Sequence, residues 1–261
     1  MVYVVNILID ALYTVKKNIK KHLRLFYLVI LFFGSHPIMA SDFSIFISKA
    51  DAFFNENIRD GRVDYETIKK SPEALDELIV MAEHVRTSPS NVSEYQAFWI
   101  NSYNLLVIKG IVNHYPLKSP LDVTGFFDKV KYQIGGQNVT LNEIENNLLR
   151  KVFPDEPRFH FVLVCAGLGC PPIISGAYKP DTLEAQMEEQ TKLAINNPDF
   201  IRIKGNKVGI SQLFEWYADD FTRNGKSILE YINQYRIQKL KNDAKLYYYP
   251  YDWTLNDTRN Q

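Results

Sequence analysis

Hydrophobic residues recur at intervals of three and four in two early segments of the chain, residues 43–58 and 71–85. This spacing places the apolar side chains on one face of a helix, so both segments are predicted to be amphipathic helices. Between them, Asp60-Gly61 indicates a turn, and the residues that follow, Val63-Asp64-Tyr65, indicate a short extended piece.

The longest hydrophobic segment runs from about Ser93 to His114 and is apolar almost all round. It is predicted to be a largely buried helix that Pro116 brings to an end. Asn101 and Asn104 lie three positions apart on this helix, and buried amides need hydrogen-bond partners. They are expected either to tie the edges of the sheet to the helix or to line a pocket and polarise a carbonyl group there.

The pattern then changes to short strands followed by helices. Gly135-Gly136 separates two short strands, and Thr140 with Glu143 three residues later forms a capping box that opens a helix.

Farther along, residues 159–165 form a continuous apolar run that predicts a short buried strand. Residues 181–197 predict a helix capped by Asp181 or Thr182, and a hairpin is expected around Gly205-Asn206. Residues 211–221 predict a last core helix, capped by the Ser at its first position. Helices outnumber strands and the strands come in hairpins, so the predicted class is α+β, with a small antiparallel sheet packed against a helical layer.

The first forty residues differ from the rest. A basic stretch precedes the apolar run LFYLVILFFG, and Ala40 then stands before the polar Ser41. This order is typical of a secretory signal peptide over residues 1–40, and the run is shorter than the ~20 residues that span a bilayer. The sequence therefore predicts an exported protein, periplasmic or associated with the cell envelope, with no membrane span after removal of the signal. The alternative is an uncleaved anchor.

Residues 41–261 are expected to form a single domain, since this part contains no linker-like tract, charge block or internal repeat. It contains 25 basic and 29 acidic residues, and this mild acidity, with no basic stripe, argues against a nucleic-acid partner. The oligomeric state does not follow from these features.

The candidate chemistry rests on few residues. After residue 40 the chain has three histidines, His84, His114 and His160, and the two cysteines are Cys165 and Cys170. Their spacing does not match a zinc site, and no nucleophile elbow, phosphate loop or dinucleotide motif is present, so no metal and no cofactor is predicted. A thiol, an imidazole and carboxylates suit acyl chemistry with a cysteine nucleophile. The alternative is that the cysteine is only a small buried hydrophobic residue.

Seven motifs occur in an order and spacing that resemble the bacterial "domain of unknown function 547" family, from about Gly61 to Phe221: GRVDY, AFWINSYN, IVNHYP, LNEIENNLLR, FHFVLVCAGLGCPP, AYKP and LFEWYADDF. The resemblance implies secreted or membrane-associated proteins, a papain-like fold and a triad made here of Glu145, His160 and Cys165. One position departs from the family pattern, because Asn146 stands where the family usually has histidine. If that histidine were the base of the family, this protein would be impaired or inactive.

The predicted strand is difficult to reconcile with this triad. Five residues of extended strand cover ~16 Å, and an odd spacing places His160 and Cys165 on opposite faces. The pair requires a bend near Val162–Val164, or else a turn at Gly167–Gly169 that brings Cys170 back to the histidine. We favour Cys165, because it ends a buried strand, and take Cys170 as a loop-shaping or resolving thiol.

Arg150 is expected to bind a carboxylate such as Asp219 or Asp220, or else to hold a carboxylate of the substrate. The sequence thus favours an exported cysteine-dependent hydrolase of peptide or amide bonds, with a peptide or a small thiol or amide compound as its ligand. One alternative is a non-catalytic envelope binding module with a structural Cys165–Cys170 disulfide. Another is a thiol-redox protein that forms adducts with small thiols such as glutathione.

Overall fold

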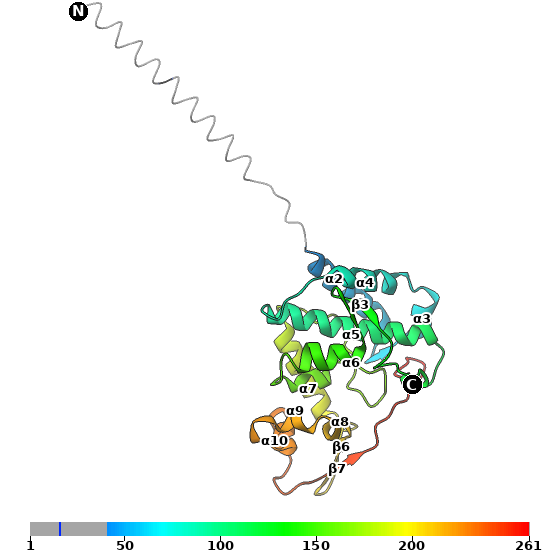
Figure 1. The fold of residues 1–261 in the computed structure, drawn as a ribbon. Coiled ribbons are helices and arrows are strands. Elements are labelled where there is room, and N and C mark those ends of the chain that lie inside the picture. Colours follow the sequence, from blue (N-terminus) through cyan, green and yellow to red (C-terminus); the bar gives the residue numbers. More distant parts are fainter. Residues whose placement is uncertain (1–15, 17–40, 261) are drawn as a thin grey trace, which may run out of the picture. The chain divides into compact units, whose positions relative to one another are not determined.

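The structure, a computed structural model, describes residues 41–260 and Lys16 (Figure 1). The predicted signal peptide, residues 1–40, lies outside the described residues except for Lys16. Residues 41–261 pack as one unit.

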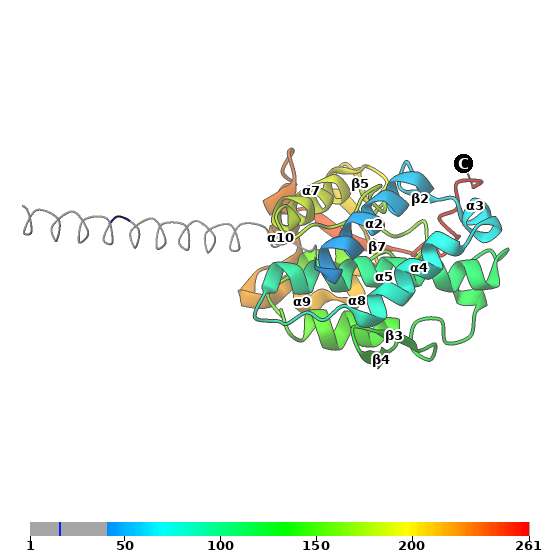
Figure 2. The same ribbon diagram turned by 90° about the horizontal axis from the view of Figure 1, so that it is seen from above.

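The first half of this unit is a layer of helices around one buried helix, α5, as Figures 1 and 2 show. The helices of this half are α2 (Asp42–Asn57), α3 (Tyr65–Lys70), α4 (Glu73–His84), α5 (Val92–His114) and a short 3-10 turn, η1 (Pro120–Asp122). The two amphipathic helices and the long buried helix are therefore confirmed. None of the helices in the described part of the chain is both long and apolar enough to cross a membrane.

Three small sheets accompany the helices. They are the pair β1 (Ile58–Arg59) and β2 (Arg62–Val63), the pair β3 (Tyr132–Ile134) and β4 (Gln137–Val139), and the three strands β5 (Ile201–Lys204), β6 (Lys207–Ser211) and β7 (Lys245–Tyr249). The consecutive strands pair antiparallel, as predicted, whereas β7 adds to β6 in parallel. The α+β class is confirmed, and the papain-like likeness stays a prediction.

The second half contains shorter helices. They are α6 (Leu141–Glu143), the π-helix η2 (Ile144–Arg150), the 3-10 helix η3 (Pro157–Phe161), α7 (Leu183–Asn196), α8 (Leu213–Trp216), α9 (Ala218–Thr222), the 3-10 turn η4 (Arg223–Gly225) and α10 (Ile228–Tyr235). The capping box at Thr140 and Glu143 is present, and Thr182 is the N-cap residue of α7.

Two predictions for this half are wrong. Residues 159–165 do not form a strand, because the chain turns through η3 and then runs on without pairing to a sheet. Residues 211–221 do not form one helix, because α8 and α9 meet at Tyr217, whose φ of -114° and ψ of 29° interrupt the helical backbone.

The apolar side chains form two cores rather than one. The larger gathers around α5, and the smaller lies among α7, the β5–β6 hairpin, α8, α9 and α10. Phe159 and Val162 belong to the larger core, whereas Phe161 between them belongs to the smaller. The η3 segment therefore lies at the seam between the two cores, which explains why an apolar run here does not need to be a strand.

The two buried asparagines of α5 hold irregular segments in place. Asn101 donates to the carbonyl of Tyr178 (2.8 Å) and accepts from its N–H (3.0 Å). Asn104 donates to the carbonyl of Val162 (2.9 Å) and accepts from the N–H of Val164 (2.9 Å). The tying role is confirmed, but what they tie is loop backbone rather than the edge of a sheet.

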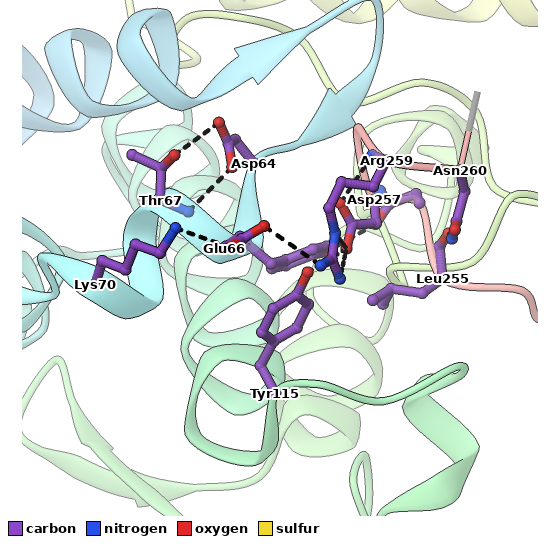
Figure 3. Close-up of polar contacts among 11 residues, drawn as sticks. Asp64, Glu66, Thr67, Lys70, Tyr115, Leu255, Asp257, Arg259 and Asn260 are labelled. Atoms are coloured by element: carbon purple, nitrogen blue, oxygen red, sulfur yellow. Dashed lines mark hydrogen bonds and ion pairs between the residues drawn. The ribbon is translucent and has the colours of Figure 1, made fainter.

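The C-terminal segment returns to the first half of the fold. After β7 the chain crosses the molecule and ends near α3 (Figure 1). Asp257 is 2% exposed and accepts from the Tyr115 hydroxyl (2.6 Å) and from Arg259, which also contacts Glu66 (Figure 3). The Tyr65 hydroxyl donates to the side-chain oxygen of Asn256 (2.7 Å). These contacts anchor the segment on α3 and the end of α5.

Candidate active site

The two cysteines lie together at the seam between the cores. Cys165 and Cys170 form a disulfide, with their Cα atoms 6.3 Å apart, well within the range that such a bond needs. The backbone N–H of Cys165 also donates to the sulfur of Cys170 (2.9 Å). The turn that joins them is thus closed by a covalent bond and a hydrogen bond.

The turn is shaped by its own residues and by the C-terminal segment. Ala166 has a φ of 63°, a left-handed conformation that costs a residue with a Cβ atom some energy and marks a tightly determined site. The N–H of Gly169 donates to the carbonyl of Asp252 (2.7 Å), and that of Leu168 donates to the carbonyl of Thr254 (2.8 Å). A Cβ atom on Gly169 would lie 2.9 Å from the Asp252 nitrogen, so only glycine fits this approach.

One side chain of the C-terminal segment reaches both sulfur atoms. The Tyr251 hydroxyl lies 3.0 Å from Cys165 Sγ and 2.9 Å from Cys170 Sγ. Burial, followed by the neighbouring Tyr217, Tyr249 and Glu145, raises the pKa of Tyr251. The hydroxyl therefore keeps its proton near neutral pH and is available as a donor to sulfur.

His160 has a carboxylate partner, but it is not the one implied by the resemblance. Its Nε2 lies 2.8 Å from Asp220 Oδ2, and its ring packs on Tyr217 with a centroid separation of 3.9 Å. An ionised carboxylate only accepts hydrogen bonds, so Nε2 donates and the Nδ1 of a neutral ring is left as the proton acceptor. The expectation that Glu145 orients the histidine is therefore corrected, because Asp220 occupies that place.

Asp220 joins His160 to Arg150, whose Nε donates to the same carboxylate oxygen (2.7 Å). Burial alone would raise the pKa of Asp220, but the hydrogen bonds from His160 and Arg150 outweigh it and hold the pKa well below the usual range. The predicted ion pair of Arg150 with an aspartate is confirmed. The guanidinium also contacts Asn146 and lies over the Tyr217 ring at 4.7 Å, so it does not line the cavity beside the cysteines.

Glu145 lies on the π-helix η2 and lines this cavity without touching the histidine. Its negative charge contributes, after burial, to the raised pKa values of Tyr103, Tyr217 and Tyr251. All three phenols are therefore neutral near pH 7. A π-helical turn is uncommon in proteins and is frequently found at functional sites.

The functional groups converge on one small cavity of about 60 Å³, which has room for a few water molecules. Both cysteines, His160, Glu145 and Tyr251 line it. It is continuous in its lining with a wider cavity of about 470 Å³, which shares Cys165 and Glu145 and is walled by aromatic rings. A still larger cavity of about 810 Å³ lies between α7 and α10, and no cysteine or histidine is among its lining residues in the described part of the chain.

The structure thus brings together four of the seven predicted site residues, Cys165, Cys170, His160 and Glu145. Asn101 and Asn104 hydrogen-bond to loop backbone, and Arg150 binds Asp220. Within the described residues, no group of three or more acidic, cysteine or histidine side chains is arranged to hold a metal ion.

The contribution of the C-terminal segment and the exposure of α8 were not predicted from the sequence. Tyr251 and Trp253 line the small cavity, as do Trp216, predicted to be a core residue but 48% exposed, and Tyr217. The available signal was the unusual density of aromatic residues in YYYPYDW, residues 247–253. No spacing rule connects that stretch to Cys165, 86 positions earlier.

Fold and site together define an α+β protein in which a cysteine pair and a histidine line one cavity, and the histidine is bound to a carboxylate outside that cavity lining. Residues 88–193 match the model of the family described as "Protein of unknown function, DUF547". This match confirms the resemblance of the motifs that lie within residues 88–193. No curated protein and no solved structure shows significant similarity to the chain. The matched region contains both cysteines and His160, whereas Asp220 and Tyr251 lie beyond its end.

Proposed function

We propose that this protein is a cysteine-dependent hydrolase of peptide or amide bonds, with Cys165 as nucleophile, His160 as base and Asp220 as the acid that orients the ring. The observation that carries the proposal is the 2.8 Å contact between His160 and Asp220 at the edge of the cavity that Cys165 lines. A thiol and an imidazole in one cavity, with a carboxylate that orients the imidazole, form the arrangement that activates a cysteine for attack on a carbonyl carbon.

In this mechanism the Cys165 thiol gives its proton to the free ring nitrogen of His160. The thiolate attacks the carbonyl carbon, and the C–N bond breaks as the histidine returns the proton to the leaving amine. Water, deprotonated by the same ring, then hydrolyses the thioester and restores the thiol. Tyr251 is placed to donate a hydrogen bond to the sulfur in its charged form.

The disulfide sets a condition on this activity. Cys165 is bonded to Cys170, so the nucleophile becomes available only when a dithiol reductant supplies two electrons and two protons and is itself oxidised to a disulfide. Cys170 is then the resolving thiol that protects Cys165 in its oxidised form.

The same bond favours a second candidate, a non-catalytic binding module in which the disulfide only stiffens the turn. A third candidate is a thiol-redox protein. In it, the same two cysteines would form mixed disulfides with small thiols.

We also propose export to the cell envelope. The order of basic, apolar and small residues before Ser41 supports it, and so does the presence of a disulfide, which persists in oxidising compartments. Protein isolated from envelope fractions is expected to begin at or near Ser41, and retention of Met1 would contradict cleavage.

The decisive experiment measures thiol reactivity. The protein is reduced, the reductant is removed, and limiting iodoacetamide is added at pH 6.5, with labelling at each cysteine followed by peptide mass. We expect Cys165 to react roughly tenfold or more faster than Cys170, because a thiolate paired with an imidazole has a pKa below the free value of ~8.5. His160→Ala slows this labelling strongly, and Asp220→Asn slows it less, because the acid acts only through the ring.

Two variants serve as controls. Cys170→Ala cannot form the disulfide, so its Cys165 labels without prior reduction at the rate of the reduced parent. Asn146→His tests whether the missing histidine matters, and we expect little change. A large gain in the labelling rate of Cys165 in that variant would indicate that the residue at position 146, and not His160, serves as the base.

Other results would overturn the proposal. If both cysteines of the reduced protein label slowly and independently of His160, the site holds a structural disulfide. If incubation with glutathione adds its mass to the protein and Cys165 shows no fast alkylation, thiol exchange replaces hydrolysis.

A further inference from the structure

The wider cavity beside the cysteine pair is lined by aromatic rings and one carboxylate. Its volume is about 470 Å³, and Cys165 and Glu145 lie at the side that it shares with the small cavity. Phe127, Trp216 and Trp253 also line it, together with Asn142 and Asn146. A group bound here would lie next to the sulfur.

The charge of this cavity is unbalanced. Glu145 is the single charged residue that lines it within the described part of the chain. No lysine, arginine or histidine in residues 41–260 lies within ion-pairing distance of that carboxylate. Arg150, whose charge interacts with that of Glu145, is bound to Asp220 and Asn146. Tyr103 and Tyr217, which also line the cavity, have raised pKa values and are neutral near pH 7, so they do not cancel the negative charge.

The walls are suited to a cation. The Trp216 and Trp253 rings lie 6.1 Å apart at an interplanar angle of 24°, and Phe127 is 6.1 Å from Trp253. Trp216 is 48% exposed, an unusual surface position for so large an apolar ring. The face of an aromatic ring is electron-rich, and several rings around one site recognise ammonium groups.

We propose that the cavity bounded by Phe127, Trp216, Trp253 and Glu145 is a subsite for an organic ammonium group. The aromatic walls replace part of the hydration of the cation, and the Glu145 carboxylate supplies its counter-charge. The inference rests on the proposed function where it names a substrate: a peptide or amide carrying an ammonium group near the carbonyl carbon that Cys165 attacks. Glu145, which does not orient the histidine, acquires a role in binding.

The test uses two probes of the same shape. Choline carries a quaternary ammonium group, and dimethylbutanol is its uncharged isostere, in which carbon replaces the nitrogen. Each is titrated into the full chain labelled with ¹⁵N at tryptophan, and the indole N–H resonances are followed by NMR. We expect choline to shift the signals of Trp216 and Trp253 and to leave the buried Trp99 unchanged, at concentrations where dimethylbutanol shifts none. Equal shifts with the two probes would show that the cavity binds apolar groups without regard to charge, and would overturn the proposal.

Variants separate charge from shape. Glu145→Gln keeps the size of the side chain but removes its charge, and it is expected to weaken choline binding roughly tenfold. Trp216→Leu removes one aromatic face and is expected to weaken choline binding by about threefold to tenfold. Glu215→Gln is the matched control, because it removes one charge from the exposed residue beside Trp216 but not from the cavity lining, and its affinity should equal that of the parent. Unchanged binding in Glu145→Gln contradicts the proposal even if the other variants fail to fold.

The binding result is independent of the thiol result. If choline binds but Cys165 of the reduced protein is unreactive, the subsite stands and the hydrolase proposal fails. If Cys165 is reactive but choline neither binds nor slows its alkylation, the subsite fails and the hydrolase proposal stands.

Discussion

At the scale of single residues, Tyr251 links the chemistry of the site to a part of the chain outside the matched family region. Its hydroxyl reaches both sulfur atoms, and its raised pKa keeps it protonated. A neutral donor close to sulfur stabilises a thiolate more than a thiol, because hydrogen bonds to charged groups are the stronger ones. Tyr251 is therefore expected to lower the pKa of the reduced Cys165.

Tyr251→Phe tests this directly. A hydrogen bond to a charged group contributes about 1.5–3 kcal/mol. Because one pKa unit corresponds to about 1.4 kcal/mol, loss of this bond should raise the pKa of the Cys165 thiol by about one unit. The pH profile of iodoacetamide labelling shifts upward by that amount, so the reduced variant is slower than the parent at pH 6.5 and reaches the same rate at high pH. Tyr248→Phe, at an exposed position on β7, is the control. A rate lowered equally at all pH values would show that the ring, and not the hydroxyl, matters.

At the scale of elements, the site depends on a junction of three short helices. Asp220 of α9 holds His160 of η3 and Arg150 of η2 through one carboxylate oxygen. The interruption between α8 and α9 places Tyr217 under the histidine ring. The irregular geometry of these helices thus positions the side chains that the proposed mechanism uses.

The depressed pKa of Asp220 makes this junction sensitive to acid. A carboxylate with a lowered folded-state pKa contributes stability that is present above its unfolded value of ~3.9 and is lost as the pH falls below it. Asp220→Asn is expected to lower the free energy of unfolding by roughly 1–3 kcal/mol at pH 7, and the difference from the parent should shrink as the pH falls below about 4. Urea denaturation at a series of pH values measures it. Asp219→Asn, at the exposed neighbour, should show no such trend, and a difference that stays constant with pH would contradict the assignment.

The elements that could be predicted from the sequence are those whose pattern is local. The periodicity of α2, α4 and α5 and the glycine turns of the two hairpins are sufficient to place them. The apolar run from Phe159 to Cys165 was wrongly predicted to be a strand. A short apolar segment is equally compatible with a strand and with a turn whose side chains enter two cores. For the site, motif resemblance identified Cys165 and His160. The partner of the histidine, 60 residues later, depends on packing that no local spacing encodes.

At the scale of the whole molecule, the C-terminal segment connects the two cores. It leaves β7 beside the smaller core, passes the cysteine turn with Tyr251 and Trp253, and ends on α3 in the larger (Figure 1). Asp257 is its anchor, and the hydrogen bonds from Tyr115 and Arg259 outweigh burial and lower the pKa of this carboxyl (Figure 3). We therefore expect the position of the tyrosine at the sulfur atoms to depend on contacts at the far end of the segment.

Asp257→Ala should consequently affect both stability and reactivity. It removes the acceptor of the Tyr115 hydroxyl and leaves that donor without its partner, so we expect the free energy of unfolding to fall by roughly 1–3 kcal/mol. Because the segment that carries Tyr251 loses its anchor, labelling of the reduced Cys165 at pH 6.5 should slow as in Tyr251→Phe. Glu66→Gln breaks only exposed ion pairs, those of Glu66 with Arg259 and with Lys70, and should leave both measurements unchanged. If Asp257→Ala lowers stability while the labelling rate stays at the parent value, the cysteine turn itself, through the backbone bonds of Leu168 and Gly169, is sufficient to position the tyrosine.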